Sequence, residues 1–142
     1  MRAFFDVNML LAMFDPGHMF HRTAMAWWAV NKSDGWASSP LTQNGYVRVI
    51  SRKSYQRPVS LPDALRSLRL QIAAPGHEFW ADDLSLLDSH SFDHARLLSV
   101  RQITDVYLLS LAVKHGGHLV TFDRGIPLMA ARGARPEHLV VL

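Results

Sequence analysis

The 142-residue sequence contains no cysteine, which excludes disulfide bonds and thiolate metal sites and fits a reducing cytoplasm. It also lacks any run of about 18 uninterrupted apolar residues, the length that a membrane-spanning helix needs. The apolar stretch at the start of the chain is interrupted by Asp6, Asn8 and Asp15, and no small-residue cleavage site follows it. We therefore expect neither a signal peptide nor a membrane span, and predict a cytoplasmic protein.

Lysine is scarce, because twelve of the fifteen basic residues are arginine, the side chain best suited to bidentate contacts with phosphate. The formal net charge is only +3, but the segment "RVISRKSYQR" concentrates four basic residues, Arg48, Arg52, Lys53 and Arg57. This segment is either a contact surface for a nucleic-acid phosphate backbone or an ordinary solvated helix face with its loop. The residues alone leave both interpretations open.

Short apolar runs alternate with segments of helical periodicity, and no repeat or linker divides the chain. We expect strands at 2–6, 36–38, 77–81, 118–122 and 138–142. Helices are expected at 8–14, 19–31, from Pro40 to about 50, after Ser60, at 105–115 with Thr104 as its cap, and at 127–132. Apolar strands that alternate with helices predict a single α/β domain over residues 1–142, with a mostly parallel sheet between helix layers.

Two of three candidate aspartates are expected at the carboxyl edge of this sheet, where ligands bind in open parallel sheets, and the third reaches it only if its helix begins beside that edge. Asp6 and Asp123 each follow a strand, and Asp105 begins the helix that precedes the strand at 118–122. Two carboxylates about 5 Å apart repel each other by about 3 kcal/mol at an effective dielectric constant near 20, so a converged set needs a cation or raised pKa values. Oxygen ligands favour Mg²⁺ or Mn²⁺, the ions that serve phosphodiester hydrolysis.

Each aspartate also has a local structural explanation. Asp105 in the first turn of a helix is favoured by the helix dipole, Asp123 can begin a turn, and Asp6 can cap the first helix. The spacing does not establish whether Asp105 reaches the other two. A metal site is therefore indicated only if all three meet at one edge.

Three segments, "FFDVNMLLAMFD", "SPLTQNGYVRV" and "RQITDVYLLSLAVKHGGHLVTFDRGI", together resemble PIN-domain ribonucleases, specifically the VapC-type toxins of bacterial toxin–antitoxin pairs. The resemblance implies a three-layer α/β/α sandwich and an endoribonuclease dependent on Mg²⁺ or Mn²⁺. It assigns Asp6, Asp105 and Asp123 to the metal, with Asn8 and Thr121 as polar supports. It also implies a homodimer that a VapB-type antitoxin neutralises.

The family pattern has a fourth acidic residue, a glutamate in a segment like "PLTENG", where this chain has Gln43. Glutamine still accepts a hydrogen bond but supplies no negative charge and accepts no proton. We expect metal binding to weaken by about 1–3 kcal/mol if one charge-assisted hydrogen bond becomes a neutral one. A natural variant with three carboxylates, a degenerate toxin and an engineered substitution all fit this residue. We predict an attenuated ribonuclease, and the alternative is an inactive module that binds RNA or antitoxin.

Two further surfaces have open interpretations. Met19, Met25, Trp27 and Trp28 on the helix at 19–31 either pack into the core or form an apolar patch for an antitoxin or a second subunit. Arg124, directly after Asp123, either contacts RNA phosphate or has a structural role at the turn.

Overall fold

Residues 1–142 are described by a computed structural model, in which five short strands form one sheet. The strand order is β3-β2-β1-β4-β5, and all four neighbouring pairs are parallel. The strands are β1 (Ala3–Phe5), β2 (Trp36–Ser38), β3 (His77–Phe79), β4 (His118–Thr121) and β5 (Leu139–Val141). The expected parallel sheet is confirmed, and all its strands end at the same edge.

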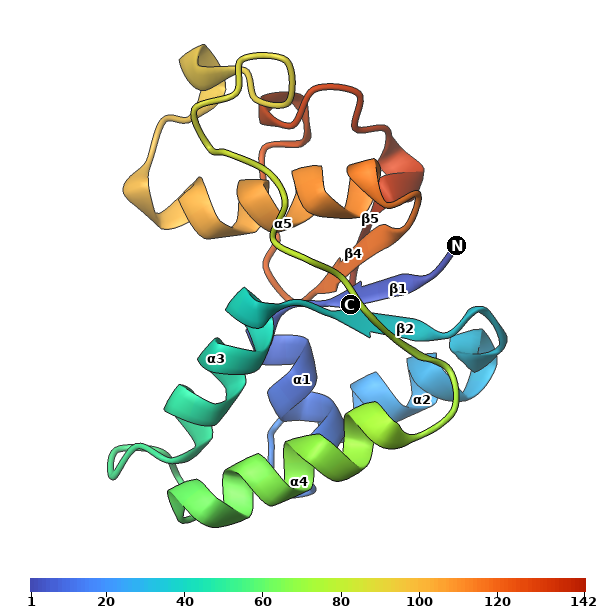
Figure 1. The fold of residues 1–142 in the computed structure, drawn as a ribbon, viewed down its shortest axis with the longest axis vertical. Coiled ribbons are helices and arrows are strands. Elements are labelled where there is room, and N and C mark those ends of the chain that lie inside the picture. Colours follow the sequence, from blue (N-terminus) through green and yellow to red (C-terminus); the bar gives the residue numbers. More distant parts are fainter.

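Helices cover both faces of the sheet, which confirms the three-layer α/β/α architecture (Figure 1). Apolar side chains of β1 divide between two cores: Phe5 belongs to one and Phe4 to the other. The Phe5 core contains residues of four helices, and the Phe4 core contains residues of the fifth. These helices are α1 (Val7–Phe14), α2 (His21–Asn31), α3 (Pro40–Ile50) and α4 (Leu61–Ala73), and, on the opposite face, α5 (Ile103–Lys114).

The helices α1 and α3 approach each other closely at Gly45, where a Cβ atom would collide with the side chain of Val7. Glycine is therefore required at this position. The start of α4 is capped as expected, because the Ser60 side chain accepts a hydrogen bond from the backbone N–H of Asp63. Both features fix the helix layer on the side of the sheet that carries Gln43.

The structure differs from the expected helices in two places: the start of α5, and the element expected at 127–132. Helix α5 begins at Ile103 with Gln102 at its N-cap, so Thr104 lies inside the helix. A 3₁₀ turn at Val100–Gln102, capped by the Ser99 side chain, leads directly into α5 and starts the helix earlier. The expected helix at 127–132 is only a 3₁₀ turn, Leu128–Ala130, because Ala131 is extended and pairs with Phe92.

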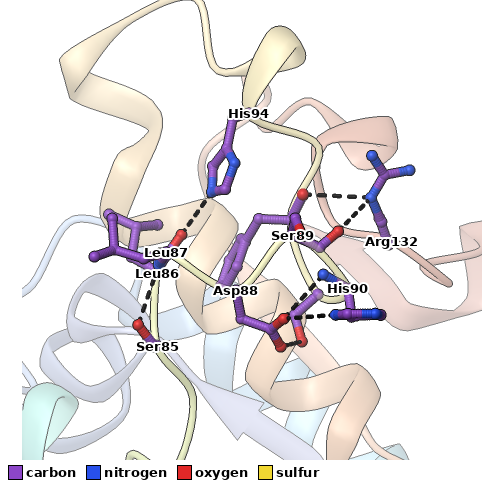
Figure 2. A network of polar contacts seen from close by, with 10 residues as sticks. Ser85, Leu86, Leu87, Asp88, Ser89, His90, His94 and Arg132 are labelled. Atoms are coloured by element: carbon purple, nitrogen blue, oxygen red, sulfur yellow. Dashed lines mark hydrogen bonds and ion pairs between the residues drawn. The ribbon is translucent and has the colours of Figure 1, made fainter.

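A network of polar contacts holds part of the long connection between β3 and α5 (Figure 2). The Asp88 carboxylate accepts hydrogen bonds from the backbone N–H of His90 and from the hydroxyl of Ser91. The Arg132 Nε donates to the carbonyl oxygens of Ser89 and Phe92, which joins the connection to the C-terminal segment. No helix of the protein is both long enough and apolar enough to cross a membrane.

Candidate active site at the carboxyl edge of the sheet

Asp6 and Asp123 follow adjacent strands, and Thr121 connects them. The Thr121 hydroxyl donates a hydrogen bond of 2.6 Å to Asp6 Oδ2, and its oxygen accepts one of 2.9 Å from the backbone N–H of Asp123. The second Asp6 oxygen, Oδ1, accepts a 2.6 Å hydrogen bond from the backbone N–H of Met9. Thr121 therefore fixes the geometry of one carboxylate and of the backbone that carries the other.

Asp6 is only 4% exposed, and its environment disfavours the charged form. Burial raises the pKa of Asp6 from 3.8 to about 6, against the opposing effect of the hydrogen bonds from Thr121 and Met9. The negative charges of Asp105 and Asp123 raise the pKa further. These contributions indicate that the three carboxylates lie close enough to interact electrostatically.

Asp105 is the third residue of α5, and its partly buried side chain faces Asp123. Its pKa is also raised to about 6, first by burial, then by the charge of Asp123 and by the hydrogen bond that Asp123 accepts from the protonated form. No ion pair of the structure involves Asp6, Asp105 or Asp123. The start of α5 thus brings a third carboxylate to the sheet edge, where no basic side chain neutralises it.

The local structural explanations also hold for these residues. Asp6 is the N-cap of α1, and Asp123 Oδ1 accepts a 2.6 Å hydrogen bond from the backbone N–H of Gly125 in a tight turn. Asp105 occupies the first turn of α5. Capping and turn formation explain why each aspartate is fixed, but they do not require three like charges at one edge.

The three carboxylates are oxygen donors, the kind of ligand that a hard and largely hydrated divalent cation prefers. No three His, Cys, Asp or Glu side chains lie in an arrangement that could hold one metal ion between them, so the site has no closed cage of three protein ligands. Mg²⁺ needs no such cage, because it usually retains several waters and binds through one or two carboxylates.

Gln43 occupies the fourth position of α3, and its side chain is engaged on the β2 side of the edge. Its Nε2 donates a 2.9 Å hydrogen bond to Ser38 Oγ, which is 2.8 Å from His77 Nε2. Sequence reasoning missed Ser38 and His77, because their contact depends on the parallel register of β2 and β3. Asn8 is exposed on α1, and its side chain makes no hydrogen bond, so its supporting role stays a prediction.

The predicted basic segment lies along α3 and beyond its end. Arg48 lines a cavity of about 540 Å³ between α3 and α4, which Gln43 also lines. Helix α3 has 11 residues and so extends about 17 Å. The loop after it, at the end remote from the sheet edge, presents three exposed basic side chains without ion pairs, Arg52, Lys53 and Arg57. Arg124 is also exposed, beside Asp123.

The apolar residues of α2 and its approach divide between core and surface. Trp27 and Trp28 pack edge-on against Phe5, with ring centroids 6.4 and 5.7 Å away. Met19 and Met25 are 82% and 42% exposed. Of the four predicted residues, the two methionines are exposed, whereas Trp27 and Trp28 are partly buried.

Comparison of the sequence with known proteins identifies the family to which the chain belongs. The model of the PIN domain matches residues 3–131, so the chain belongs to the PIN-domain family, among the VapC-type ribonucleases. Ribonuclease VapC44 of Mycobacterium tuberculosis is 48% identical over 142 residues, with 100% of both chains covered. Ribonuclease VapC38 of the same species is 40% identical over 141 residues, covering 99% of this chain and 96% of the relative.

Solved structures share the fold at low sequence identity. The crystal structure of Mycobacterium tuberculosis VapC20, described as a toxin that cleaves the sarcin–ricin loop, matches with a TM-score of 0.61 and 17% identity. The match covers 94% of this chain and 99% of that one. VapBC2 from Rickettsia felis, bound to a DNA fragment from its promoter, matches with a TM-score of 0.57 and 14% identity over 87% of this chain and 89% of that one.

Proposed function

We propose that this protein is a divalent-metal-dependent endoribonuclease, the toxin of a toxin–antitoxin pair. The single observation that carries the proposal is that Thr121 joins Asp6 to Asp123 at the sheet edge, with Asp105 beside them and no ion pair to any of the three. Such a cluster of oxygen ligands is suited to Mg²⁺ or Mn²⁺. Full-length similarity to proteins named ribonucleases supports the same reaction class.

In this proposal one or two of the three aspartates would bind the cation directly and the remaining carboxylate would act through its bound waters. The cation, when bound, would supply an activated water and neutralise charge on the scissile phosphate. Thr121 orients Asp6 through a hydrogen bond of 2.6 Å. Arg124, exposed beside Asp123, contacts a phosphate of the RNA. Arg48, Arg52, Lys53 and Arg57 continue the phosphate-binding surface along α3 and its following loop.

Gln43 lowers the activity in this proposal. It stands where the resemblance implies a glutamate, and as an amide it adds no negative charge to the site. The Gln43→Glu variant should therefore cleave RNA faster. An unchanged rate and unchanged metal affinity would show that residue 43 does not limit the reaction.

A VapB-type antitoxin is the proposed protein partner, supported by the structural likeness to a VapBC complex. Exposed apolar side chains suited to such a partner occur at Met19 and Met25, and at Leu61 and Leu65 beside the cavity between α3 and α4. A homodimer is proposed on the family resemblance.

The test is cleavage of a mixture of tRNA and ribosomal RNA by the purified protein with Mg²⁺, with Mn²⁺ and with EDTA. We expect metal-dependent cleavage that Asp105→Asn abolishes. Asp63→Asn is the matched control, because Asp63 also lies in the first turn of a helix but pairs with Arg66 on the surface. Equal cleavage by Asp105→Asn and Asp63→Asn would contradict the proposed site.

The second candidate function is a non-catalytic module that binds RNA or antitoxin. Two observations favour it: the amide at Gln43, and the absence of any three His, Cys, Asp or Glu side chains arranged to hold one metal ion. Absence of cleavage by both the natural chain and Gln43→Glu, with RNA binding retained, would support this alternative. Cleavage by Gln43→Glu alone would instead indicate an intact site that lacks one charge.

A further inference from the structure

We propose that Ser38 and His77 are positioning residues that fix the Gln43 side chain as a hydrogen-bond donor. Because an amide donates a hydrogen bond and a carboxylate does not, this pair favours glutamine over glutamate at position 43. The distances are 2.9 Å from Gln43 Nε2 to Ser38 Oγ and 2.8 Å from Ser38 Oγ to His77 Nε2. The Ser38 side chain is fully buried, so water does not substitute for either partner.

The direction of these hydrogen bonds follows from the two partners of Ser38. Ser38 Oγ accepts from Gln43 Nε2, and the only other partner for its own buried hydroxyl proton is His77 Nε2, so the proton of the neutral ring belongs on Nδ1. Nε2 is then an acceptor, and the Ser38 hydroxyl must donate to it. The remaining lone pairs of Ser38 Oγ accept from the Gln43 amide, which makes every donor meet an acceptor.

The groups around His77 keep the ring neutral. Burial lowers the pKa of His77, and the positive charge of Arg2 lowers it further, against the raising effects of the Ile72 carbonyl and of Glu78. Arg2 and Glu78 form an ion pair of 2.8 Å, which limits the influence of the Glu78 charge. Trp36 contacts the imidazole, with ring centroids 4.4 Å apart, and adds no charge.

A glutamate at position 43 would reverse this arrangement. A carboxylate accepts but does not donate, so the Ser38 hydroxyl would have to turn toward it. His77 Nε2 would then lose its donor and would face a lone pair of Ser38, which a proton on Nε2 relieves. The imidazole can acquire this proton by binding a second proton and becoming a cation, and the negative charge of the new carboxylate favours that form.

The direct test is the pKa of His77 measured by NMR titration in the natural chain and in Gln43→Glu. We expect the substitution to raise this pKa by about one to three units, the range for a new opposite charge with a hydrogen bond. Asn44→Asp is the matched control, because it adds the same charge at an exposed neighbouring position of α3. We expect Asn44→Asp to shift the pKa by less than half as much.

Ser38→Ala separates the hydrogen bonds from the charge. With Ser38→Ala in the background, Gln43→Glu should shift the His77 pKa no more than Asn44→Asp does. Equal shifts for Gln43→Glu and Asn44→Asp in the natural background would overturn the proposal. The titration requires no ribonuclease activity, so its outcome is independent of whether the proposed function holds.

A second readout rests on the proposed function. Any rate gained by Gln43→Glu should fall as the pH rises through the raised pKa of His77. In the double variant with His77→Gln this dependence should vanish, because a glutamine amide offers either a donor or an acceptor to Ser38. A pH profile that is the same with and without His77 would contradict the positioning role.

Discussion

Replacing Asp6 with asparagine should stabilise the metal-free protein at high pH. The pKa of Asp6 is raised from 3.8 to about 6, and each unit corresponds to about 1.4 kcal/mol, so ionisation of Asp6 costs the folded state about 3 kcal/mol. The pKa of Asp6 is higher in the folded than in the unfolded state, so the folded protein is not penalised below pH 3.8, where Asp6 is protonated in both states. The stability falls as the pH rises from 3.8 through about 6, because the buried carboxyl group must then ionise.

Asparagine removes the charge but keeps only one acceptor oxygen. With that oxygen toward the backbone N–H of Met9, the amide nitrogen faces Thr121 Oγ1, whose hydroxyl must rotate to accept a hydrogen bond. The exchange of one hydrogen bond costs about 1 kcal/mol. We therefore expect Asp6→Asn to gain about 2 kcal/mol at pH 8 and to be neutral or slightly destabilised at pH 4.

The assay is urea unfolding followed by tryptophan fluorescence from pH 4 to pH 8 in the presence of EDTA, with Asp63→Asn as control. The same Asp6→Asn protein should be inactive on RNA. If Asp6 served only as a helix cap, asparagine would replace it equally well at every pH. A stability difference that does not change with pH would therefore refute the argument from burial and like charge.

Three further predictions concern the same edge and the basic surface. Mn²⁺ at 100 times its Kd should raise the Tm of the natural chain by about 5–10 °C in a thermal shift assay but leave Asp105→Asn unchanged. Thr121→Val, which deprives Asp6 Oδ2 of its donor and the backbone N–H of Asp123 of its acceptor, should cost about 1–3 kcal/mol in urea unfolding at pH 7; unchanged stability would contradict the bridging role. The last prediction concerns Arg52 and Lys53, both replaced with alanine in the Asp105→Asn background. The slope of log K against log salt for binding of single-stranded RNA, measured by fluorescence anisotropy, should decrease in magnitude by about 1.4. An unchanged slope would exclude these phosphate contacts.

Local sequence patterns were sufficient to predict the sheet and most of the helices. The strand at 36–38 agrees at both ends, and α3 begins at Pro40 as expected, because apolar runs and N-terminal proline are local signals. The start of α5 was predicted too late. Thr104 is a typical capping residue, but the 3₁₀ turn Val100–Gln102 leads directly into the helix, which begins at Ile103. Boundaries set by neighbouring turns are harder to predict than the elements themselves.

The candidate site was only partly accessible from the sequence. Asp6 and Asp123 could be assigned to the edge because each follows a strand, whereas the approach of Asp105 depends on how α5 packs against the sheet. The contact between Ser38 and His77 depends on strands 39 residues apart and has no local signature. Contacts of this kind are decided by strand order and register.

We propose that Asp6, Asp105 and Asp123 together form a divalent cation site. The decisive experiment is titration calorimetry of Mn²⁺ binding at pH 7.5 on the unsubstituted protein, on Asp105→Asn and on Asp63→Asn. We expect saturable binding to the natural chain and to Asp63→Asn, and its loss in Asp105→Asn. Equal binding to all three proteins, or binding to none, would contradict the claim.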